Sequence, residues 1–285
     1  MNADRLLSLW QYPIPQHLIS RLMGLVANSQ NPAIRDPFVK WFAQRYGVNM
    51  AEAANPDLAS YRTFNEFFTR PLKAGARPVD ADAKSIVSPA DGAISELGPI
   101  SDDAIMQAKG WSYSARTLLG GDENLAASFR DGLFMTVYLS PKDYHRVHLP
   151  LAGTLRETIY VPGRLFSVNT RTANGVPGLF ARNERVVCIF DTVAGPMAVV
   201  LVGAIIVAGI ATVWQGTVTP PHRRLEVTSF GSGRAPVSMQ KGDEIGRFLV
   251  GSTAIVLLPK DVARWRDDLR AGSPLRMGER IGTLR

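Results

Sequence analysis

The chain has 285 residues, of which 46% are hydrophobic, and it carries a formal net charge of +7. This length is enough to bury a substantial core in one large domain or two modest ones. A basic balance suits nucleic acid, an anionic membrane surface or an acidic substrate. The sequence has no zinc-ligand spacing, no stacked run of Lys and Arg and no aromatic-interleaved RNA motif. We therefore expect neither a nucleic-acid partner nor a bound metal.

The N-terminus and the cysteine content bear on the cellular compartment. Asp4 and Arg5 are followed by only a short apolar stretch, which is broken at Pro13 and Pro15, so we predict no secretory signal peptide. The single cysteine, Cys188, lies in an apolar run and cannot form an intramolecular disulfide. We predict that it is a buried strand residue rather than a nucleophile, and that the environment is reducing.

Residues 1–75 are predicted to be helical and amphipathic. Apolar side chains recur at helical spacing over residues 18–26. Asp36 followed by Pro37 predicts the start of a second helix, because proline is favoured at the first helical position. A capping box over residues 63–66 predicts a short third helix.

The apolar stripes of these helices have two interpretations. They can pack on the protein's own core, or they can dock on a lipid interface, which Trp10, Trp41 and the nearby Arg and Lys residues would suit. Both interpretations can hold for different helices. We expect residues 1–75 to be a membrane-facing region.

Residues 76–285 change to short β-rich runs bounded by Gly, Pro and Asp, and we predict one β-rich catalytic domain there. Two turns, residues 241–246 and 277–282, echo each other and suggest pseudo-repeated strands. The predicted fold class is α+β, with N-terminal amphipathic helices followed by this β-rich core. Three of its strands are predicted at residues 134–139, 186–190 and 254–258.

One stretch in this region, residues 196–214, has 19 residues without a charge and is long enough to cross a bilayer. It contains β-branched clusters at residues 199–202 and 205–207, punctuated by Gly203 and Gly209. We predict two buried strands that turn near a glycine rather than a transmembrane helix.

Three segments contain residues suited to catalysis, and each alone also fits an ordinary loop. Asp91 lies in an Ala-Asp-Gly turn, where a carboxylate could orient a histidine. His145 and His148 lie three residues apart after a proline, and histidine is the side chain best suited to proton transfer near neutral pH. Gly251 and Ser252 lie between strand-like runs, where a serine hydroxyl could attack the preceding glycine carbonyl.

Together these segments resemble the bacterial type of phosphatidylserine decarboxylase. The family's marks are Ala90-Asp91-Gly92, the stretch 138–150 with both histidines, and Gly251-Ser252-Thr253. The likeness runs from about Tyr61 to Leu258. Val250 stands where the family usually has leucine, and this keeps the position apolar.

The resemblance implies a first stage of self-processing at the bond between Gly251 and Ser252. Asp91, His148 and Ser252 would act like the triad of a serine hydrolase, with His148 taking the serine proton. The serine oxygen would attack the Gly251 carbonyl, and β-elimination, tautomerisation and hydrolysis would turn Ser252 into a pyruvoyl group. A large chain, residues 1–251, and a small chain, residues 252–285, would remain associated.

The resemblance also implies the second stage, which is decarboxylation of phosphatidylserine to phosphatidylethanolamine. The covalent pyruvoyl group would form a Schiff base with the substrate amine and act as an electron sink, as pyridoxal phosphate does elsewhere. His145 would serve decarboxylation as a donor near the substrate carboxylate or the carbanion, and Ser167 would contact the substrate. We expect a peripheral protein on the cytoplasmic face of the cell membrane, bound to its anionic surface. The sequence leaves open whether the protein forms a homodimer.

Two other classes of function compete with this interpretation. A serine hydrolase could use the same triad on an external ester or peptide, although the chain lacks the Gly-x-Ser-x-Gly elbow of the common hydrolase fold. Alternatively, the chain could be a non-enzymatic β-rich carrier or membrane-binding module. The hydrolase would stay whole at 31.1 kDa, and the non-enzymatic module would not need Ser252.

Overall fold

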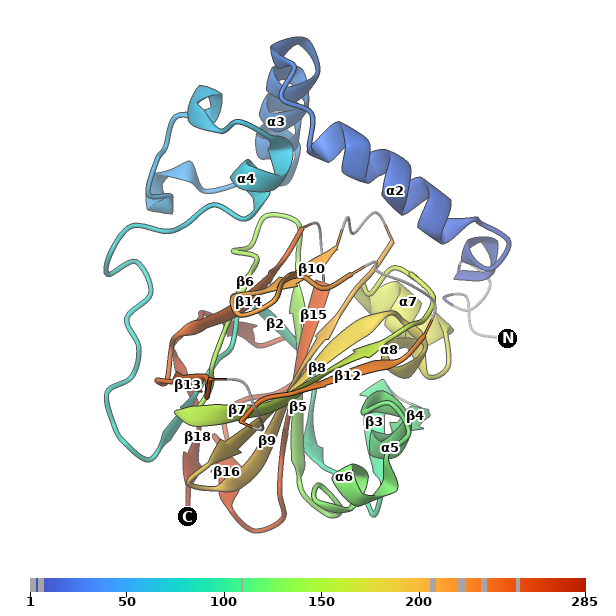
Figure 1. The fold of residues 1–285 in the computed structure, drawn as a ribbon, viewed down its shortest axis with the longest axis vertical. Helices are drawn as coiled ribbons and strands as arrows, with labels where there is room; N and C mark the ends of the chain where they lie inside the picture. The colour runs from blue at the N-terminus through green and yellow to red at the C-terminus, as the bar shows by residue number, and fades with distance from the viewer. Residues whose placement is uncertain are drawn as a thin grey trace.

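The structure is a computed structural model, and it describes residues 4, 8–108, 110–205, 209–219, 224–231, 235–249 and 252–285. Helices come first in the chain and strands dominate the remainder, which confirms the predicted α+β class (Figure 1). The helical elements are η1 (Leu9–Gln11), α2 (Gln16–Ala27), α3 (Pro32–Tyr46), η2 (Met50–Glu52), η3 (Leu58–Ser60), α4 (Phe64–Phe68), α5 (Ala115–Leu118), α6 (Glu123–Ala127), α7 (Thr170–Gly175) and α8 (Leu179–Arg182).

The strands contain the three runs that the sequence predicts, and many more. They are β1 (Ser85–Val87), β2 (Gly92–Pro99), β3 (Ala104–Ala108), β4 (Trp111–Ser114), β5 (Leu133–Leu139), β6 (Arg146–His148), β7 (Gly153–Val161), β8 (Arg185–Thr192), β9 (Gly195–Val202), β10 (Ile210–Thr212), β11 (Gly216–Thr217), β12 (Glu226–Ser229), β13 (Ser238–Met239), β14 (Glu244–Phe248), β15 (Ser252–Leu258), β16 (Ala263–Trp265), β17 (Pro274–Leu275) and β18 (Arg280–Leu284).

The largest sheet in the described residues has nine strands and is antiparallel throughout. Its order is β12-β7-β8-β9-β15-β5-β2-β17, and β13 also pairs with β7. Two smaller sheets have the orders β1-β18-β16 and β11-β10-β14-β6. The strand that begins at Ser252, β15, is therefore an interior strand, with β5 on one side and β9 on the other.

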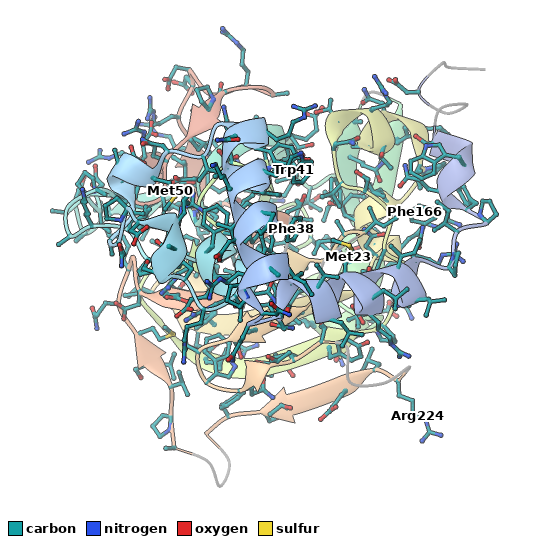
Figure 2. The ribbon with its side chains drawn as sticks, turned by 90° about the horizontal axis from the view of Figure 1, so that it is seen from above. Met23, Phe38, Trp41, Met50, Phe166 and Arg224 are labelled. Carbon is teal, nitrogen blue, oxygen red and sulfur yellow. The ribbon has the colours of Figure 1, made fainter. Side chains whose placement is uncertain are left out.

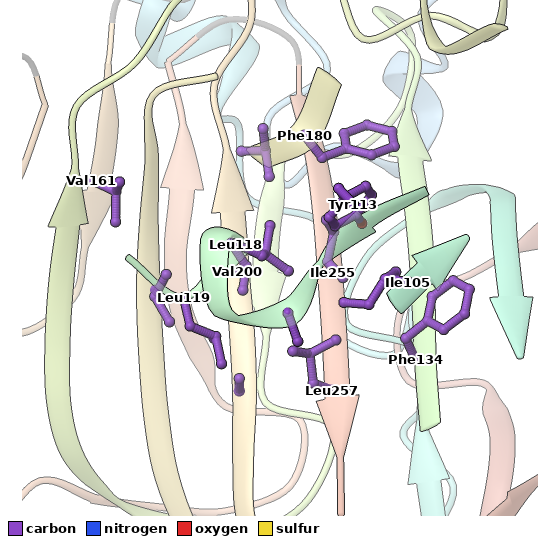
Figure 3. Packing of buried hydrophobic residues seen from close by; sticks show 14 of the residues in the cluster. Ile105, Tyr113, Leu118, Leu119, Phe134, Val161, Phe180, Val200, Ile255 and Leu257 are labelled. Atoms are coloured by element: carbon purple, nitrogen blue, oxygen red, sulfur yellow. The ribbon is translucent and has the colours of Figure 1, made fainter. Parts of the chain in front are cut away.

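Both faces of the large sheet are buried, and this explains why its central strands are continuously apolar rather than alternating. On one face, Val200, Ile255 and Leu257 pack against Ile105 and Tyr113 of the β3-β4 hairpin, together with helices α5 to α8 (Figure 3). Successive strand residues point to opposite faces, so the neighbours of these residues belong to a second core. That core lies under the two smaller sheets and includes Val147, Val199, Ile245, Val256 and Ile281.

The helices α2, α3 and α4 lie together beyond one end of the large sheet (Figure 1). Phe42 of α3 is the centre of an aromatic cluster, with ring centroids 4.9 Å from Phe64, 6.2 Å from Phe67 and 5.7 Å from Phe68. These rings and Val39 are buried. The apolar stripe of α3 thus packs largely on the protein itself.

The start of α3 differs from the sequence prediction, which placed it at Asp36 and Pro37. The helix begins at Pro32, because the side chain of Asn31 accepts a hydrogen bond from the backbone N–H of Ala33 at 3.0 Å. A proline directly after this cap needs no N–H donor. Pro37 lies inside the helix instead.

The cap predicted at the start of α4 is confirmed. The hydroxyl of Thr63 accepts from the backbone N–H of Glu66 at 3.0 Å. The reciprocal bond of a capping box shifts by one residue, because Glu66 Oε2 accepts from the backbone N–H of Arg62 at 2.6 Å. The first bond satisfies a donor that the first turn of a helix leaves free, and the second ties the residue before the cap to the helix.

Helix α2 buries two polar side chains against the protein and leaves three of its leucines exposed. Leu18, Leu22 and Leu25 are 56%, 55% and 72% exposed, whereas Gln16 and Ser20 are buried. The side chain of Gln16 accepts from the backbone N–H of Leu165 at 2.9 Å and is therefore tied to the β-rich part of the chain. The apolar stripe of α2 is thus not part of the core.

The uncharged stretch 196–214 forms strands β9 and β10, as predicted, with residues 206–208 between them lying outside the described residues. Residues 197–202 of β9 are fully buried in the sheet. No helix within the described part of the chain is both long and apolar enough to cross a membrane.

The two echoed turns each lead into a strand of one of the smaller sheets, β14 after the first turn and β18 after the second. Gly242 and Gly278 have φ of +88° and +84°, where a side chain would strain the backbone. An added Cβ would lie 2.6 Å from Val79 at Gly242, and 2.7 Å from the carbonyl oxygen of Pro78 at Gly278. Both turns therefore need glycine and pack on the same segment of the chain.

Candidate active site

The predicted cleavage site lies at the head of β15. The backbone of Ser252 pairs with Leu139, the last residue of β5. Val250, Gly251 and the side chain of Ser252 lie outside what the structure describes. The position of the site is thus given by the backbone of Ser252 and by its neighbours.

His148 ends β6 and is buried, with its orientation set by two hydrogen bonds to the backbone. Its backbone N–H donates to the carbonyl of Pro89 at 2.7 Å, and its ring Nδ1 lies 2.7 Å from the carbonyl oxygen of Gly242. A carbonyl only accepts, so Nδ1 carries the proton and Nε2 has the lone pair. The hydroxyl of Tyr144 lies 3.2 Å from Nε2 and can donate to it.

Burial lowers the pKa of His148, and the carbonyl of Gly242 opposes this shift only in part. The imidazole is therefore neutral at physiological pH. A neutral imidazole with a fixed lone pair at Nε2 is the form that can take a proton from a hydroxyl.

The carboxylate of Asp91 is held by Arg77 rather than by a histidine. Arg77 Nε lies 2.8 Å and 3.0 Å from the two carboxylate oxygens, and its Nη2 lies 2.5 Å from Oδ2. The backbone N–H of Met277, in the second echoed turn, also donates to Asp91 at 2.8 Å. This bonding differs from the triad expected from the sequence, because the carbonyl of Gly242 makes the bond to His148 that was expected from Asp91.

His145 is completely buried and lies against an aromatic ring. Its Nδ1 donates to the carbonyl of Asp143 at 2.8 Å, and its ring centroid is 4.0 Å from that of Phe68. Its Nε2 has no hydrogen-bond partner among the described residues. Burial lowers the pKa of His145 to about 3, so its ring is neutral and one buried acceptor stays unsatisfied.

A tight turn at the end of β5 sets the position of His145. The side chain of Asp143 accepts from the backbone N–H and from the hydroxyl of Ser140, both at 2.7 Å. The backbone N–H of Asp143 donates to the Ser140 carbonyl at 2.9 Å. Because this turn is fixed, the carbonyl of Asp143 faces the imidazole. His148 lies on strand β6, His145 directly precedes it, and the two histidines have separate hydrogen-bond partners.

Two cavities meet beside the end of β5. An apolar cavity of about 390 Å³ lies between the N-terminal helices and the sheet, and its walls include Phe68, Leu139 and Ser167. Figure 2 shows Met23 on α2 and Trp41 on α3, two further residues of these walls, from above. A second, polar cavity of about 860 Å³ contains Arg77, Asp91 and Tyr144 in its walls.

Tyr138 lies in the walls of both cavities, and it pairs with Thr253 in the sheet. The apolar cavity thus reaches the strand partner of Ser252 and the ring that covers His145. The backbone N–H of Ser167 is held by the side chain of Gln11 at 2.9 Å. Of the predicted residues, Asp91 lines the polar cavity and Ser167 the apolar one. His145 and His148 line neither cavity, and Asp91 bonds to neither histidine.

Four residues at this site were not predicted from the sequence: Arg70, Arg77, Tyr144 and Gly242. Tyr144 lies within the histidine segment and Gly242 within the first echoed turn, so both had a local signal. Arg70 and Arg77 had none, because an arginine near a proline is common in surface loops. Their burial depends on contacts with residues distant in the chain.

Comparisons with known proteins identify the family of the chain. The family model described as phosphatidylserine decarboxylase matches residues 64–283, and a second model, described as PSD, matches residues 6–47. A phosphatidylserine decarboxylase proenzyme of Pseudomonas entomophila is 60% identical over 279 residues, which is 98% of this chain and 97% of the relative. The proenzyme of Ectopseudomonas mendocina is 58% identical over 280 residues, 98% of each chain. The chain belongs to the phosphatidylserine decarboxylase family.

Proposed function

We propose that the chain is a precursor that cuts itself between Gly251 and Ser252 and then decarboxylates phosphatidylserine to phosphatidylethanolamine. The observation that carries this proposal is a buried, neutral His148 with its lone pair at Nε2. Its strand, β6, pairs with β14, the strand that directly precedes Ser252 in the chain. The relatives are named as proenzymes of this activity, which fits a precursor.

In the first stage His148 Nε2 takes the proton of Ser252, whose oxygen attacks the carbonyl carbon of Gly251. The C–N bond breaks and the chain is then joined by an ester. Elimination releases the carboxylate of Gly251 and leaves a dehydroalanine at residue 252. Its tautomer is hydrolysed by one water, which releases ammonia and leaves the keto group.

The place of β15 supports association of the two products. The small chain, residues 252–285, would begin with a strand that lies between β5 and β9, and it would contribute β17 and β18 to two sheets. Leu257 and the other apolar residues of β15 are buried. Removing this strand would expose both cores, so cleavage of one peptide bond leaves the fold intact.

The surroundings of residue 252 fit a pyruvoyl group, because a buried acceptor, Nε2 of His145, stays unsatisfied near an apolar cavity. Once formed, the pyruvoyl group would supply a ketone for the substrate amine and an electron sink for the bond that releases carbon dioxide. Nε2 of His145 has a free lone pair and can accept a hydrogen bond from the substrate amine, while the low pKa keeps the ring neutral. Being neutral, it does not stabilise the substrate carboxylate before the reaction.

We also propose that residues 1–75 bind the surface of a membrane and that the protein is peripheral on its cytoplasmic face. The exposed leucines of α2 and the exposed Trp10 support lipid contact. The apolar cavity with Ser167 in its wall lies directly under these helices and could receive the lipid. The unpaired, buried Cys188 suits a reducing compartment.

Self-cleavage is tested by denaturing electrophoresis and intact mass. The wild-type protein should give two chains that split at Gly251 and Ser252, and hydride reduction should add hydrogen to the ketone of the small chain. Ser252→Ala should stay whole at 31.1 kDa, whereas Ser101→Ala, an exposed serine, should be cut normally. An active wild-type preparation without a cut would refute the proposal and favour the hydrolase interpretation.

Variants of the two histidines should behave differently in the same assay. His148→Ala should stay uncut, because the base is lost. His145→Ala should be cut and then release little carbon dioxide from phosphatidylserine. Normal processing of the His148 variant would show that another group is the base.

Lipid binding is tested with vesicles that contain phosphatidylserine. Leu22→Asp and Leu25→Asp should reduce flotation with the vesicles and leave self-cleavage unchanged. Val193→Asp, at an 89% exposed apolar residue in the turn between β8 and β9, is the control and should float as wild type does. Equal flotation of all variants would show that α2 does not contact lipid.

A further inference from the structure

The polar cavity contains a buried guanidinium that has no carboxylate partner in the described part of the chain. Arg70 is 3% exposed and lines this cavity. Its Nη2 donates to the Lys142 carbonyl at 3.3 Å and its Nη1 to the Phe67 carbonyl at 3.5 Å, while Nε has no partner. These contacts are long, so most of its hydrogen-bonding capacity is unused.

The carboxylates around Arg70 are already engaged by other groups. Asp91 and Glu52 are bonded to Arg77, and Asp143 is bonded to Ser140. Their negative charges favour the charged form of Arg70, although burial is the larger effect and lowers its pKa. A buried cation that is only partly compensated favours an anionic ligand.

We propose that Arg70 binds the phosphodiester of the substrate lipid, with the headgroup in the polar cavity. This inference rests on the proposed function, because it assumes a glycerophospholipid substrate. A guanidinium matches the geometry of a phosphate through two parallel N–H donors. The cavity volume of about 860 Å³ lies within the usual range of small-molecule sites.

The chemistry argues for the phosphodiester and against the carboxylate as the partner of Arg70. A cation on the carboxylate would stabilise the substrate more than the transition state, where that charge is leaving as carbon dioxide, and would slow the reaction. A phosphodiester keeps its charge throughout, so binding it anchors the substrate without this cost.

The two cavities place the parts of such a lipid on either side of one residue. Tyr138 separates the polar cavity, which contains Arg70, from the apolar cavity under α2 and α3. Tyr138 is also the partner in the sheet of Thr253, next to the reacting position. A lipid with its phosphate on Arg70 and its apolar part against Phe68 would therefore pass beside residue 252.

The test compares Arg70→Met and Arg70→Lys with wild type, with Arg130→Met, at an exposed arginine, as the control. Self-cleavage in each variant reports that the site is folded. The KM for water-soluble dihexanoyl phosphatidylserine should rise at least about 10-fold in Arg70→Met, the loss expected for a charge-assisted hydrogen bond, with a smaller rise in Arg70→Lys. The kcat should change less than KM.

Calorimetry with sn-glycero-3-phosphoethanolamine and with ethanolamine isolates the contribution of the phosphate. Wild type should bind the phosphate-containing compound at least about 10-fold more tightly, and Arg70→Met should lose this preference. If Arg70→Met does not cut itself, the KM of Arg70→Lys and the preference of wild type for the phosphate-containing compound test the inference instead. Equal binding of both compounds by wild type, or an unchanged KM in a processed Arg70 variant, would overturn the inference.

The outcomes keep this inference apart from the proposed function. A wild-type protein that does not cut itself or does not release carbon dioxide would refute the proposed function. A wild-type protein that does both, with a phosphate preference independent of Arg70, would refute only the role of this residue.

Discussion

Burial of His145 predicts a specific sensitivity of the folded protein to acid. In the folded chain the pKa of His145 is lowered to about 3, from an ordinary 6.5, because the ring is buried. In the unfolded chain the ring is solvated and takes up a proton below pH 6.5. Unfolding therefore binds a proton between these two values, and the unfolded state gains stability as the pH falls.

The contribution of His145 to stability is fully present above pH 6.5 and is lost as the pH falls toward 3. One unit of pKa difference corresponds to about 1.4 kcal/mol. Between pH 7 and pH 5 the folded ring stays neutral while the unfolded ring becomes charged, so the free energy of unfolding should fall by about 2 kcal/mol. For a chain of this size this loss lowers the Tm by roughly 4 to 8 °C.

The measurement compares thermal unfolding at pH 7 and pH 5 for two proteins that both carry Ser252→Ala, so that each remains one chain. One protein keeps His145, and the other carries His145→Gln, which cannot titrate. His148 and the other titratable groups are the same in both, so the difference between the two acid-induced shifts in Tm isolates His145. Equal shifts in the two proteins would refute the claim that the ring is held neutral by burial.

Two further predictions concern the groups that position Asp91 and His148. Arg77→Met should leave the carboxylate of Asp91 buried without its cation and lower the free energy of unfolding by about 3 to 5 kcal/mol. Arg116→Met removes an exposed ion pair and should lower the free energy of unfolding by less than about 1 kcal/mol. Similar losses for the two variants in urea unfolding would contradict this prediction. Gly242→Ala should displace the carbonyl that orients His148 and slow self-cleavage, because its Cβ would lie 2.6 Å from the side chain of Val79. Gly75→Ala has the same positive φ and open space around it, so slow cleavage in both variants would point to backbone strain alone.

Several features of the fold could be predicted from local sequence. The continuous apolar run at residues 254–258 predicted a buried strand, and β15 is one. The uncharged stretch 196–214 predicted strands rather than a membrane helix, because its β-branched residues favour extended backbone. The start of α3 was misplaced, since Asn31 with Pro32 and Asp36 with Pro37 both resemble helix starts, and only one can begin the helix.

Part of the candidate site could be predicted from short sequence motifs, and part of it follows only from the tertiary structure. Short motifs identified Asp91, both histidines and Ser252, because the residue types and their order in the chain are sufficient for a resemblance. They did not reveal that His148 bonds to Gly242, which is 94 residues away in the chain. Nor did they reveal that Arg77 takes the carboxylate expected to orient that histidine.

The same division explains the orientation of α2 and the burial of Arg70. Helical periodicity predicts which side chains share a face, but the face that turns inward depends on what the rest of the chain offers. Gln16 finds a backbone donor 149 residues away, so Gln16 packs inward and the leucines of α2 stay exposed. Backbone preferences act over a few residues, whereas burial and hydrogen bonding of side chains are settled by competition among distant segments, and this competition is resolved only when the chain has folded.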